Sequence, residues 1–364
     1  MVRHFVGLTA ATLTLALAAH AAALTPSETA RILAGLSVDA EASAEVGDSL
    51  VSRYASRVET VWTTYDTEIG TPMADWATAN VPRTAGETIF YPFAGADFTT
   101  VYRFYPDASR YVLVALQPGG RVPSLTGAWD EREAIFDFFA TITENFGRRG
   151  FFITRELNDQ FVRGEELVVD GITPVLMVMA EREGFTVESV EPIRVNDDGS
   201  GIEVRTENTN YRSTWNSVRL NLTRNSTGAS VTVDYLLLDL SNENLQGNEA
   251  HGAFITSMTQ HRVLLKAASH LLQYTNFTYL RDAILANSPS VLQEESGVDY
   301  TLLAEQFDVT LFGRFTDVNT LFRNEDLQLG LIEAYAAASD LPELPFTIGY
   351  RKDAGSCLQV AVRR

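Results

Sequence analysis

Two short segments of the sequence carry residues that could do acid–base or cation-binding chemistry. The first is Tyr91–Phe98 (YPFAGADF), in which Asp97 follows a turn built around Gly95. In open α/β sheets a ligand binds beyond the carboxyl end of a strand, where the turn leads into a helix. Asp97 is therefore a candidate catalytic carboxylate, and Gly95 and Phe98 are candidate ligand contacts. The alternative is that Asp97 only caps the helix and Gly95 only turns the chain.

The second segment is Leu292–Gly297 (LQEESG), where two adjacent carboxylates follow a short apolar run. Either Glu294 or Glu295 could act as a general base or bind a cation, with Ser296 as a supporting catalytic donor. Gly297 is a candidate ligand contact. Adjacent side chains of a regular strand point to opposite faces, so we expect at most one of the two carboxylates to enter a site. The alternative is a solvated acidic turn.

The other common catalytic and metal-binding patterns are missing from the sequence. The histidines beyond residue 23 are His251, His261 and His270, and they form no H-E-x-x-H motif. His261 and His270 lie on opposite sides of either a helix or a strand. Cys357, the single cysteine, is predicted to be a small core residue. The sequence therefore predicts no metal site and leaves any cofactor unknown.

The first 23 residues predict a cleaved secretory signal. Arg3 gives a positive start, Phe5–Leu17 is a short apolar run, and Ala19–Ala23 provides the small residues that a signal peptidase requires. The apolar run is too short to cross a bilayer, which needs about 20 residues. We therefore expect an exported protein, periplasmic or secreted, with no integral membrane segment after cleavage.

The composition predicts a folded and strongly acidic protein. Of its 364 residues, 45% are hydrophobic, and the net charge is −19. Loss of Arg3 with the signal leaves 27 basic residues (28 − 1) against 47 acidic ones, a net charge of −20. A surface this negative repels nucleic acid, so we exclude a nucleic-acid partner. The partner is then an unknown small molecule or protein.

The elements that must position the two segments change type near residue 85. Residues 24–84 are predicted to form a helical lead, which Trp76 packs onto the main body. Beyond it, Thr88–Phe93 and Tyr111–Leu116 are apolar runs typical of buried strands, and Phe98–Tyr105 between them is a short helix. A strand, a helix and a second strand in so few residues predict a parallel βαβ unit.

The rest of the chain continues to alternate between strands and helices, so residues 85–364 are predicted to form one domain. Asp130–Phe146 is an aromatic amphipathic helix, and the turn Asn196–Gly201 is either the turn of a hairpin or a boundary loop. The last two apolar runs, Phe346–Arg351 and Leu358–Val362, predict a terminal antiparallel hairpin. The whole pattern predicts an α/β fold with a single mixed, mostly parallel sheet and flanking helices, with an α+β fold as the alternative.

The same residues resemble a group of bacterial exported proteins and lipoproteins of unknown function. That group shares a Y-P-F-x-G-x-D-F block, an F-x-P-x-A-x-x-Y-V-L-x-x-L-x-P block, an L-Q-(D/E)-(D/E)-S-G block and an L-P-F-x-I-G-Y block. In this chain the blocks are Tyr91–Phe98, Phe104–Pro118, Leu292–Gly297 and Leu344–Tyr350. The group favours aspartate where this chain has its two adjacent glutamates. The resemblance spans most of the chain beyond residue 23 and lends no activity.

The order of elements is also similar to that of Rossmann-like methyltransferases. Both open with a strand that leads to a G-x-D sequence, then a helix, a turn (Pro106–Ala108 here) and a second strand, and both close with an antiparallel hairpin. The similarity implies a Rossmann-like sheet. Because the glycine-rich cofactor loop is reduced to Gly95, it also implies that the cofactor function has been lost.

Two functions remain open at this stage. In the first, the chain is an α/β enzyme in which Asp97 and Glu294 or Glu295 converge on one cleft. Asp97→Asn is then expected to leave folding intact and to abolish a ligand-induced gain in stability. In the second, the chain is a non-catalytic binding or scaffold protein on a degenerate Rossmann-like frame. It would then have either a pocket without convergent titratable groups or an exposed apolar patch for a partner, with the aromatic helix Asp130–Phe146 as the candidate for the patch.

Overall fold

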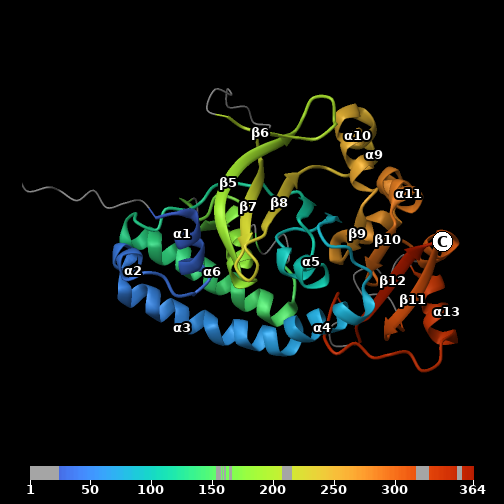
Figure 1. Ribbon diagram of the computed structural model, residues 1–364, viewed down its shortest axis with the longest axis horizontal. Helices are drawn as coiled ribbons and strands as arrows, with labels where there is room; N and C mark the ends of the chain where they lie inside the picture. The colour runs from blue at the N-terminus through green and yellow to red at the C-terminus, as the bar shows by residue number, and fades with distance from the viewer. Residues whose placement is uncertain are drawn as a thin grey trace, which may run out of the picture.

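The computed structural model describes residues 24–152, 157, 159, 161–163, 166–206, 215–316, 328–350 and 355–364. The predicted signal, residues 1–23, lies outside these ranges. The described chain is built around one ten-stranded sheet that has helices on both faces (Figure 1). None of the described helices is both long and apolar enough to cross a membrane.

Five neighbouring strands form the parallel centre of the sheet. In sheet order they are β10 (Ser290–Gln293), β9 (Arg262–Leu265), β1 (Thr88–Pro92), β2 (Arg110–Ala115) and β8 (Ser230–Leu237). The chain starts at β1, moves outward through β2 to β8, and then returns to the other side of β1 with β9 and β10. The direction of winding therefore reverses between β1 and β9, which makes this place the topological switch point of the sheet.

Antiparallel strands flank this parallel centre on both sides, so the prediction of a mostly parallel sheet is confirmed for the centre only. Next to β8 lie β7 (Ser217–Arg224), β5 (Phe185–Val195) and β6 (Ile202–Val204). The predicted hairpin across Asn196–Gly201 is confirmed as β5–β6. Beyond β10 lie β12 (Cys357–Arg363) and β11 (Phe307–Gly313). A separate two-stranded sheet joins β3 (Val162–Arg163) and β4 (Glu166–Leu167).

The predicted terminal hairpin is wrong. β12 is the expected last strand, but its antiparallel partners are β11 and β10. The described part of the expected first strand, residues 346–350, has no strand structure. These residues are apolar because they pack onto the sheet as an irregular segment, and an apolar composition alone does not separate the two cases.

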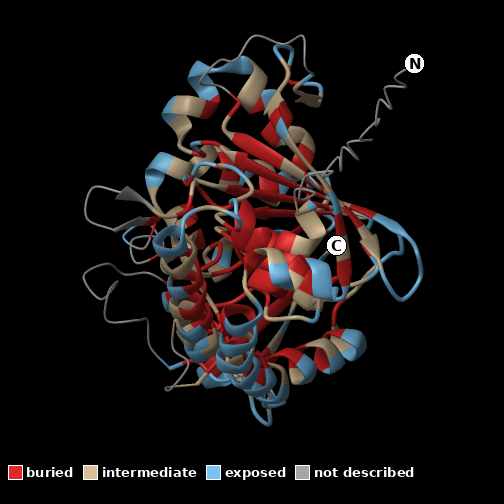
Figure 2. Cartoon of the chain, turned by 90° about the vertical axis from the view of Figure 1, so that its left-hand side faces the viewer, coloured by how far each residue is buried: buried red, intermediate tan, exposed pale blue. Residues whose placement is uncertain are grey.

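Helices cover the two faces of the sheet with separate hydrophobic cores. The first face carries α1 (Pro26–Leu33), α2 (Ala40–Val46), α3 (Asp48–Tyr65), a π-helix (Asp66–Gly70), α4 (Thr71–Asn80), α5 (Phe98–Phe104), α6 (Trp129–Arg149) and α8 (Thr173–Arg182). The second carries α9 (Asn242–Gly247), α10 (Glu249–Met258), the 3-10 segments Ala267–Gln273 and Thr275–Phe277, α11 (Thr278–Asn287) and α12 (Tyr300–Gln306). The last helix, α13 (Leu329–Ala337), packs near the start of β12. Figure 2 shows the buried strands between helices with exposed outer faces.

The central strands belong to both cores because alternate residues point to opposite faces. In β1, Ile89 and Tyr91 pack on the first core while Phe90 packs on the second. A strand buried on both faces needs apolar residues at every position, which explains its continuous apolar sequence. Helix α1 begins directly after Thr25, because Thr25 and Glu28 form a capping box.

The helical lead is packed tightly on the rest of the chain. As predicted, Trp76 joins it to the body, since its ring centroid lies 5.0 Å from that of Phe312 and 5.8 Å from that of Phe346. The aromatic helix α6 is confirmed, but its phenylalanines are buried between the lead and the sheet. The expectation of an exposed apolar patch on this helix is therefore wrong.

Candidate functional site

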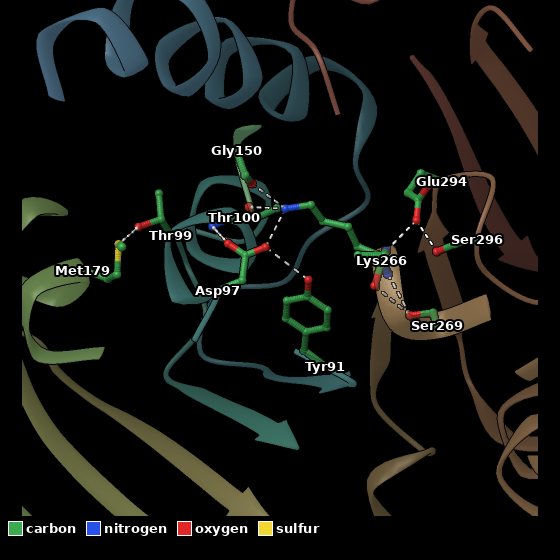
Figure 3. Close-up of polar contacts among 11 residues, drawn as sticks. Tyr91, Asp97, Thr99, Thr100, Gly150, Met179, Lys266, Ser269, Glu294 and Ser296 are labelled. Atoms are coloured by element: carbon green, nitrogen blue, oxygen red, sulfur yellow. Dashed lines mark hydrogen bonds and ion pairs between the residues drawn. The ribbon is translucent and has the colours of Figure 1, made fainter. Parts of the chain in front are cut away.

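The carboxyl ends of β1, β9 and β10 bring four ionisable side chains to one edge of the sheet. Asp97 follows β1 after a four-residue turn (residues 93–96), and Lys266 follows β9 directly. Glu294 and Glu295 follow β10 directly. Because the three strands are parallel neighbours, these positions lie side by side at the carboxyl edge of the sheet. Figure 3 shows Asp97, Lys266 and Glu294 at this edge.

Lys266 and Asp97 form a buried ion pair at this edge. The Lys266 Nζ lies 2.6 Å from Asp97 Oδ2, and the two side chains are 2% and 4% exposed. The same ammonium donates to the hydroxyl of Thr100 at 3.1 Å and to the carbonyl of Gly150 at 2.8 Å. All three ammonium N–H groups are therefore used.

Both oxygens of the Asp97 carboxylate also accept hydrogen bonds. Its Oδ1 accepts the backbone N–H of Thr100, which makes Asp97 the N-cap of α5, and its Oδ2 also accepts the hydroxyl of Tyr91 at 3.2 Å. The carbonyl of Gly150 reaches Lys266 because α6 ends there in a left-handed turn with φ +73°. The ion pair thus ties together the ends of β1, β9 and α6.

Glu294 and Glu295 form a second buried group on the other side of the Lys266 main chain. Glu294 accepts the backbone N–H of Ala267 at 2.6 Å and the hydroxyl of Ser296 (Figure 3). The thiol of Cys357 donates to Glu295 at 3.5 Å. The two residues are 0% and 6% exposed. The alternative of a solvated acidic turn is therefore wrong.

The two carboxyl groups face one another, although adjacent strand residues were expected to diverge. They can converge because they follow the last residue of β10, where the regular strand geometry has ended. One oxygen of each, Glu294 Oε2 and Glu295 Oε1, is buried without a hydrogen-bond donor. Burial raises the pKa of Glu295 well above its usual range, and the neighbouring Glu294 raises it further. The protonated form of Glu295 is therefore favoured by its surroundings.

An irregular segment, Leu344–Tyr350, covers this carboxyl pair. At Gly349 a Cβ atom would lie 2.7 Å from Glu294 Oε2 and 2.9 Å from Glu295 Oε2, so only glycine allows this approach. The segment is held by the Ile348 N–H, which donates to the Ser356 hydroxyl at 2.8 Å. Beside it, the ring centroid of Tyr350 lies 5.5 Å from that of Phe151.

Backbone strain accompanies the site. Among the described residues, the non-glycine positions with positive φ are Phe93 (61°), Ala267 (55°), Gln328 (58°) and Asp340 (57°). Phe93 and Ala267 follow β1 and β9, and Gln328 donates its side-chain amide to the carbonyl of Glu295 at 3.0 Å. Such conformations cost about 1–3 kcal/mol each and cluster at functional sites.

The sequence-predicted residues separate into two groups. Asp97, Glu294, Glu295 and Ser296 all lie at the carboxyl edge, but Asp97 contacts the tip of Lys266 whereas Glu294 contacts the backbone beyond it. No hydrogen bond joins Asp97 to either glutamate in the described chain, and all three carboxylates are buried rather than open to a cleft.

Packing and chain turning account for the positions of the three predicted ligand contacts, Phe98, Gly95 and Gly297. Phe98 is buried in the first core beside Tyr111 and Phe185. Gly95 is the left-handed residue of the turn, with φ +57° and open space where a Cβ would lie. Gly297 lies against the side chain of Gln293, where a Cβ would come within 2.2 Å.

Lys266 is the main residue that the sequence predictions missed. It is one of only two lysines in a chain with 28 basic residues. It also follows the apolar strand Arg262–Leu265 without a turn between them, which is an unusual place for a solvated charge. Gly349 and Tyr350 were also missed, because their segment was assigned to a strand.

The described residues contain no group of three or more His, Cys, Asp or Glu side chains that could hold a metal ion. No protein-family model, curated protein or solved structure matches this chain. The class that the fold defines is thus an α/β protein with a mixed ten-stranded sheet, with a buried ion pair at its switch point and a buried carboxyl pair next to it.

A further buried carboxyl, Glu183 beside α5, gives a separate pH prediction. Its Oε2 lies 2.7 Å from the Nε of Arg103, yet burial raises the pKa of Glu183 to about 7. Because the folded state then binds a proton that the unfolded state releases above about pH 4.5, the free energy of unfolding falls as pH rises from 4.5 to 7. The decrease attributable to this residue is about 3 kcal/mol.

We expect Glu183→Gln to remove this contribution to the pH dependence of the free energy of unfolding. Urea unfolding at pH 5, 6, 7 and 8 measures it. The wild-type chain should lose stability more steeply than the variant between pH 5 and 7, and in parallel with it above pH 8. Equal slopes in the two proteins between pH 5 and 7 would show that Glu183 keeps an ordinary titration.

Proposed function

We propose that the chain is an exported α/β enzyme in which the Glu294–Glu295 pair supplies the proton of an acid–base reaction. The observation that carries this proposal is the buried carboxyl pair at the end of β10, where burial and the neighbouring carboxyl raise the pKa of Glu295 and two oxygens lack donors. Two carboxyls that share a proton provide an acid and a base in one place. The predicted signal in residues 1–23 supports export.

A Rossmann-like frame is supported by the order of the five parallel strands. Numbered along the chain, they run 3-2-1-4-5 across the sheet, which is the order of doubly wound nucleotide-binding folds. In such folds the ligand binds beyond the carboxyl ends of the strands, at the switch point. The carboxyl pair lies next to this position.

The roles of the residues follow from their hydrogen bonds. Glu295 is the acid that gives its proton to the leaving group, and Glu294 is the carboxylate that takes a proton from the attacking water. The hydroxyl of Ser296 and the backbone N–H of Ala267 fix the orientation of Glu294. Asp97 and Lys266 are positioning residues, because each already uses its polar atoms within the protein.

The test is a set of chromogenic substrates whose leaving groups need a proton: glycosides, carboxylic esters and phosphate esters, each assayed from pH 5 to 9. We expect turnover of one class, reduced at least about 100-fold in Glu295→Gln. Glu183→Gln is the matched control, since it alters a buried carboxyl with a raised pKa outside the pair and should keep the activity. Failure of all three classes, or full activity in Glu295→Gln, contradicts the proposal.

A second function, a non-catalytic binding or scaffold protein, is favoured by one specific observation. The Lys266–Asp97 pair fills the switch point with the protein's own side chains, as expected of a frame that no longer holds a ligand there. In that case the carboxyl pair serves only the fold. Both Glu294→Gln and Glu295→Gln would then lower stability at every pH, and neither would change any turnover.

A further inference from the structure

The Glu294–Glu295 pair is the place where three distant parts of the chain meet. The pair itself follows β10, and Cys357 at the start of β12 donates its thiol to Glu295. Gly349 in the covering segment Leu344–Tyr350 lies directly against both carboxyl groups. Any change in the charge of the pair therefore acts on the contact between this segment and the sheet.

Within the described part of the chain, the charged and titratable groups around the pair leave a second negative charge without a compensating cation. From β12 and α13, Cys357 and Tyr335 are neutral and buried; burial raises the pKa of both well above the usual range. From the covering segment, Tyr350 is neutral for the same reason. No ion pair joins either glutamate to a cation within the described residues.

The remaining charges at this edge do not change that balance. Tyr91, on β1, is neutral, because burial and Asp97 raise its pKa well above the usual range. Lys266 is the nearby cation, but its three N–H groups are taken by Asp97, Thr100 and Gly150. A single shared proton is therefore what allows the two carboxyl groups to stay in contact in a buried space.

We propose that one proton shared by Glu294 and Glu295 acts as a latch, which holds the segment Leu344–Tyr350 over the carboxyl edge of the sheet. When this proton leaves at alkaline pH, two buried negative charges lie in contact. Separation of the segment from the sheet lets water reach both charges. The segment has room to move, because a cavity of about 350 Å³ is lined by Leu344, Phe346 and Thr347 together with Gly355 and Ser356.

The latch goes beyond the proposed enzyme activity and requires no reaction. It predicts opening of one segment at alkaline pH, whether or not the chain turns over a substrate. A failed substrate assay with a working latch would overturn the enzyme alone. A pH-independent segment with Glu295-dependent turnover would overturn the latch alone.

The single cysteine provides the probe. Cys357 is 1% exposed and contacts Glu295, so a thiol reagent reaches it only after the latch opens. The full chain is treated with iodoacetamide at pH 6, 7, 8 and 9, and labelling is followed by intact mass. Each rate is divided by the rate of the urea-unfolded chain at the same pH, which removes the pH dependence of the thiol itself.

We expect protection of Cys357 to fall at least about tenfold from pH 6 to pH 9 in the wild-type chain. Protection should stay constant in Glu295→Gln, whose neutral side chain cannot lose a proton. Glu294→Gln leaves one carboxyl and serves as the second variant if the first does not fold. Glu183→Gln is the control and should follow the wild-type chain.

Hydrogen exchange of α3 separates local opening from global unfolding. The latch predicts that peptides covering residues 344–350 lose protection at pH 9 while peptides covering α3 keep it. Three results overturn the proposal: constant protection of Cys357 in the wild-type chain, an equal loss in Glu295→Gln, or a parallel loss in α3.

Discussion

Lys266→Met should lower the free energy of unfolding by about 3–5 kcal/mol, because it leaves the Asp97 carboxylate buried without its counter-ion. The methionine keeps the length of the side chain, so the lost charge rather than a cavity dominates the effect. Asp97→Asn should also destabilise the chain, because it leaves the Lys266 ammonium unpaired in a 2% exposed position. The sequence-based expectation that Asp97→Asn leaves folding intact therefore changes. Urea unfolding at pH 7 measures both effects.

The double variant Asp97→Asn/Lys266→Met gives the sharpest check. It removes both charges and keeps a side-chain oxygen at the N-cap of α5, so it should be more stable than either single variant. Asp308→Asn is the control, since Asp308 pairs with Arg364 at the surface and should change stability by less than about 1 kcal/mol. Additive losses in the double variant would mean that the ion pair is not the source of the effect.

Gly349→Ala should lower the free energy of unfolding by about 2–5 kcal/mol. The backbone φ of +76° disfavours any residue with a Cβ, which costs about 1–2 kcal/mol. The added methyl would also overlap the buried oxygens of Glu294 and Glu295, an overpacking that costs about 1–3 kcal/mol more. Both carboxyl groups are fixed by their own contacts, so neither can move aside freely.

Gly95→Ala separates the two parts of this effect. Gly95 also has a positive φ, +57°, but nothing lies within 4 Å of where its Cβ would be. It should therefore show the backbone cost alone, about 1–2 kcal/mol. If the two alanine variants unfold at the same urea concentration, the covering segment does not press on the carboxyl pair as described.

The elements of the sheet centre were predictable because they carry local signals. Thr88–Pro92 and Arg110–Ala115 are apolar at almost every position, and the short helix between them is capped by Asp97. Their parallel pairing follows from the crossover that joins them. The flanking antiparallel strands were harder to predict, because apolar content does not show which strands become neighbours.

The covering segment shows what local patterns cannot separate. Phe346 and Ile348 alternate with polar or small residues as in a half-buried strand, but they pack onto the first core without joining the sheet. Their burial is set by Trp76, Phe104 and the carboxyl edge, all distant in sequence. A period-two pattern reports burial on one side and leaves open whether a hydrogen-bonded neighbour exists.

Only part of the candidate site could be predicted from the sequence. Asp97 and Glu294–Ser296 were identified as polar residues that follow apolar runs, and the structure brings them to one edge of the sheet. Their relation depends on Lys266, which lies 169 residues after Asp97 in sequence. A long-range pair of this kind leaves no spacing signal, and the position is indicated only by the rarity of lysine in this chain and by its place directly after an apolar run.

The position of β12 between β10 and β11 has a consequence for the order of folding. Within the described chain, β11 pairs with β12 alone, yet β12 is made about 44 residues later (313 to 357). During synthesis β11 therefore stays unpaired until the last strand has emerged. A chain that stopped before Cys357 would lose two strands from the sheet rather than one, and would leave β10 as an open edge prone to association.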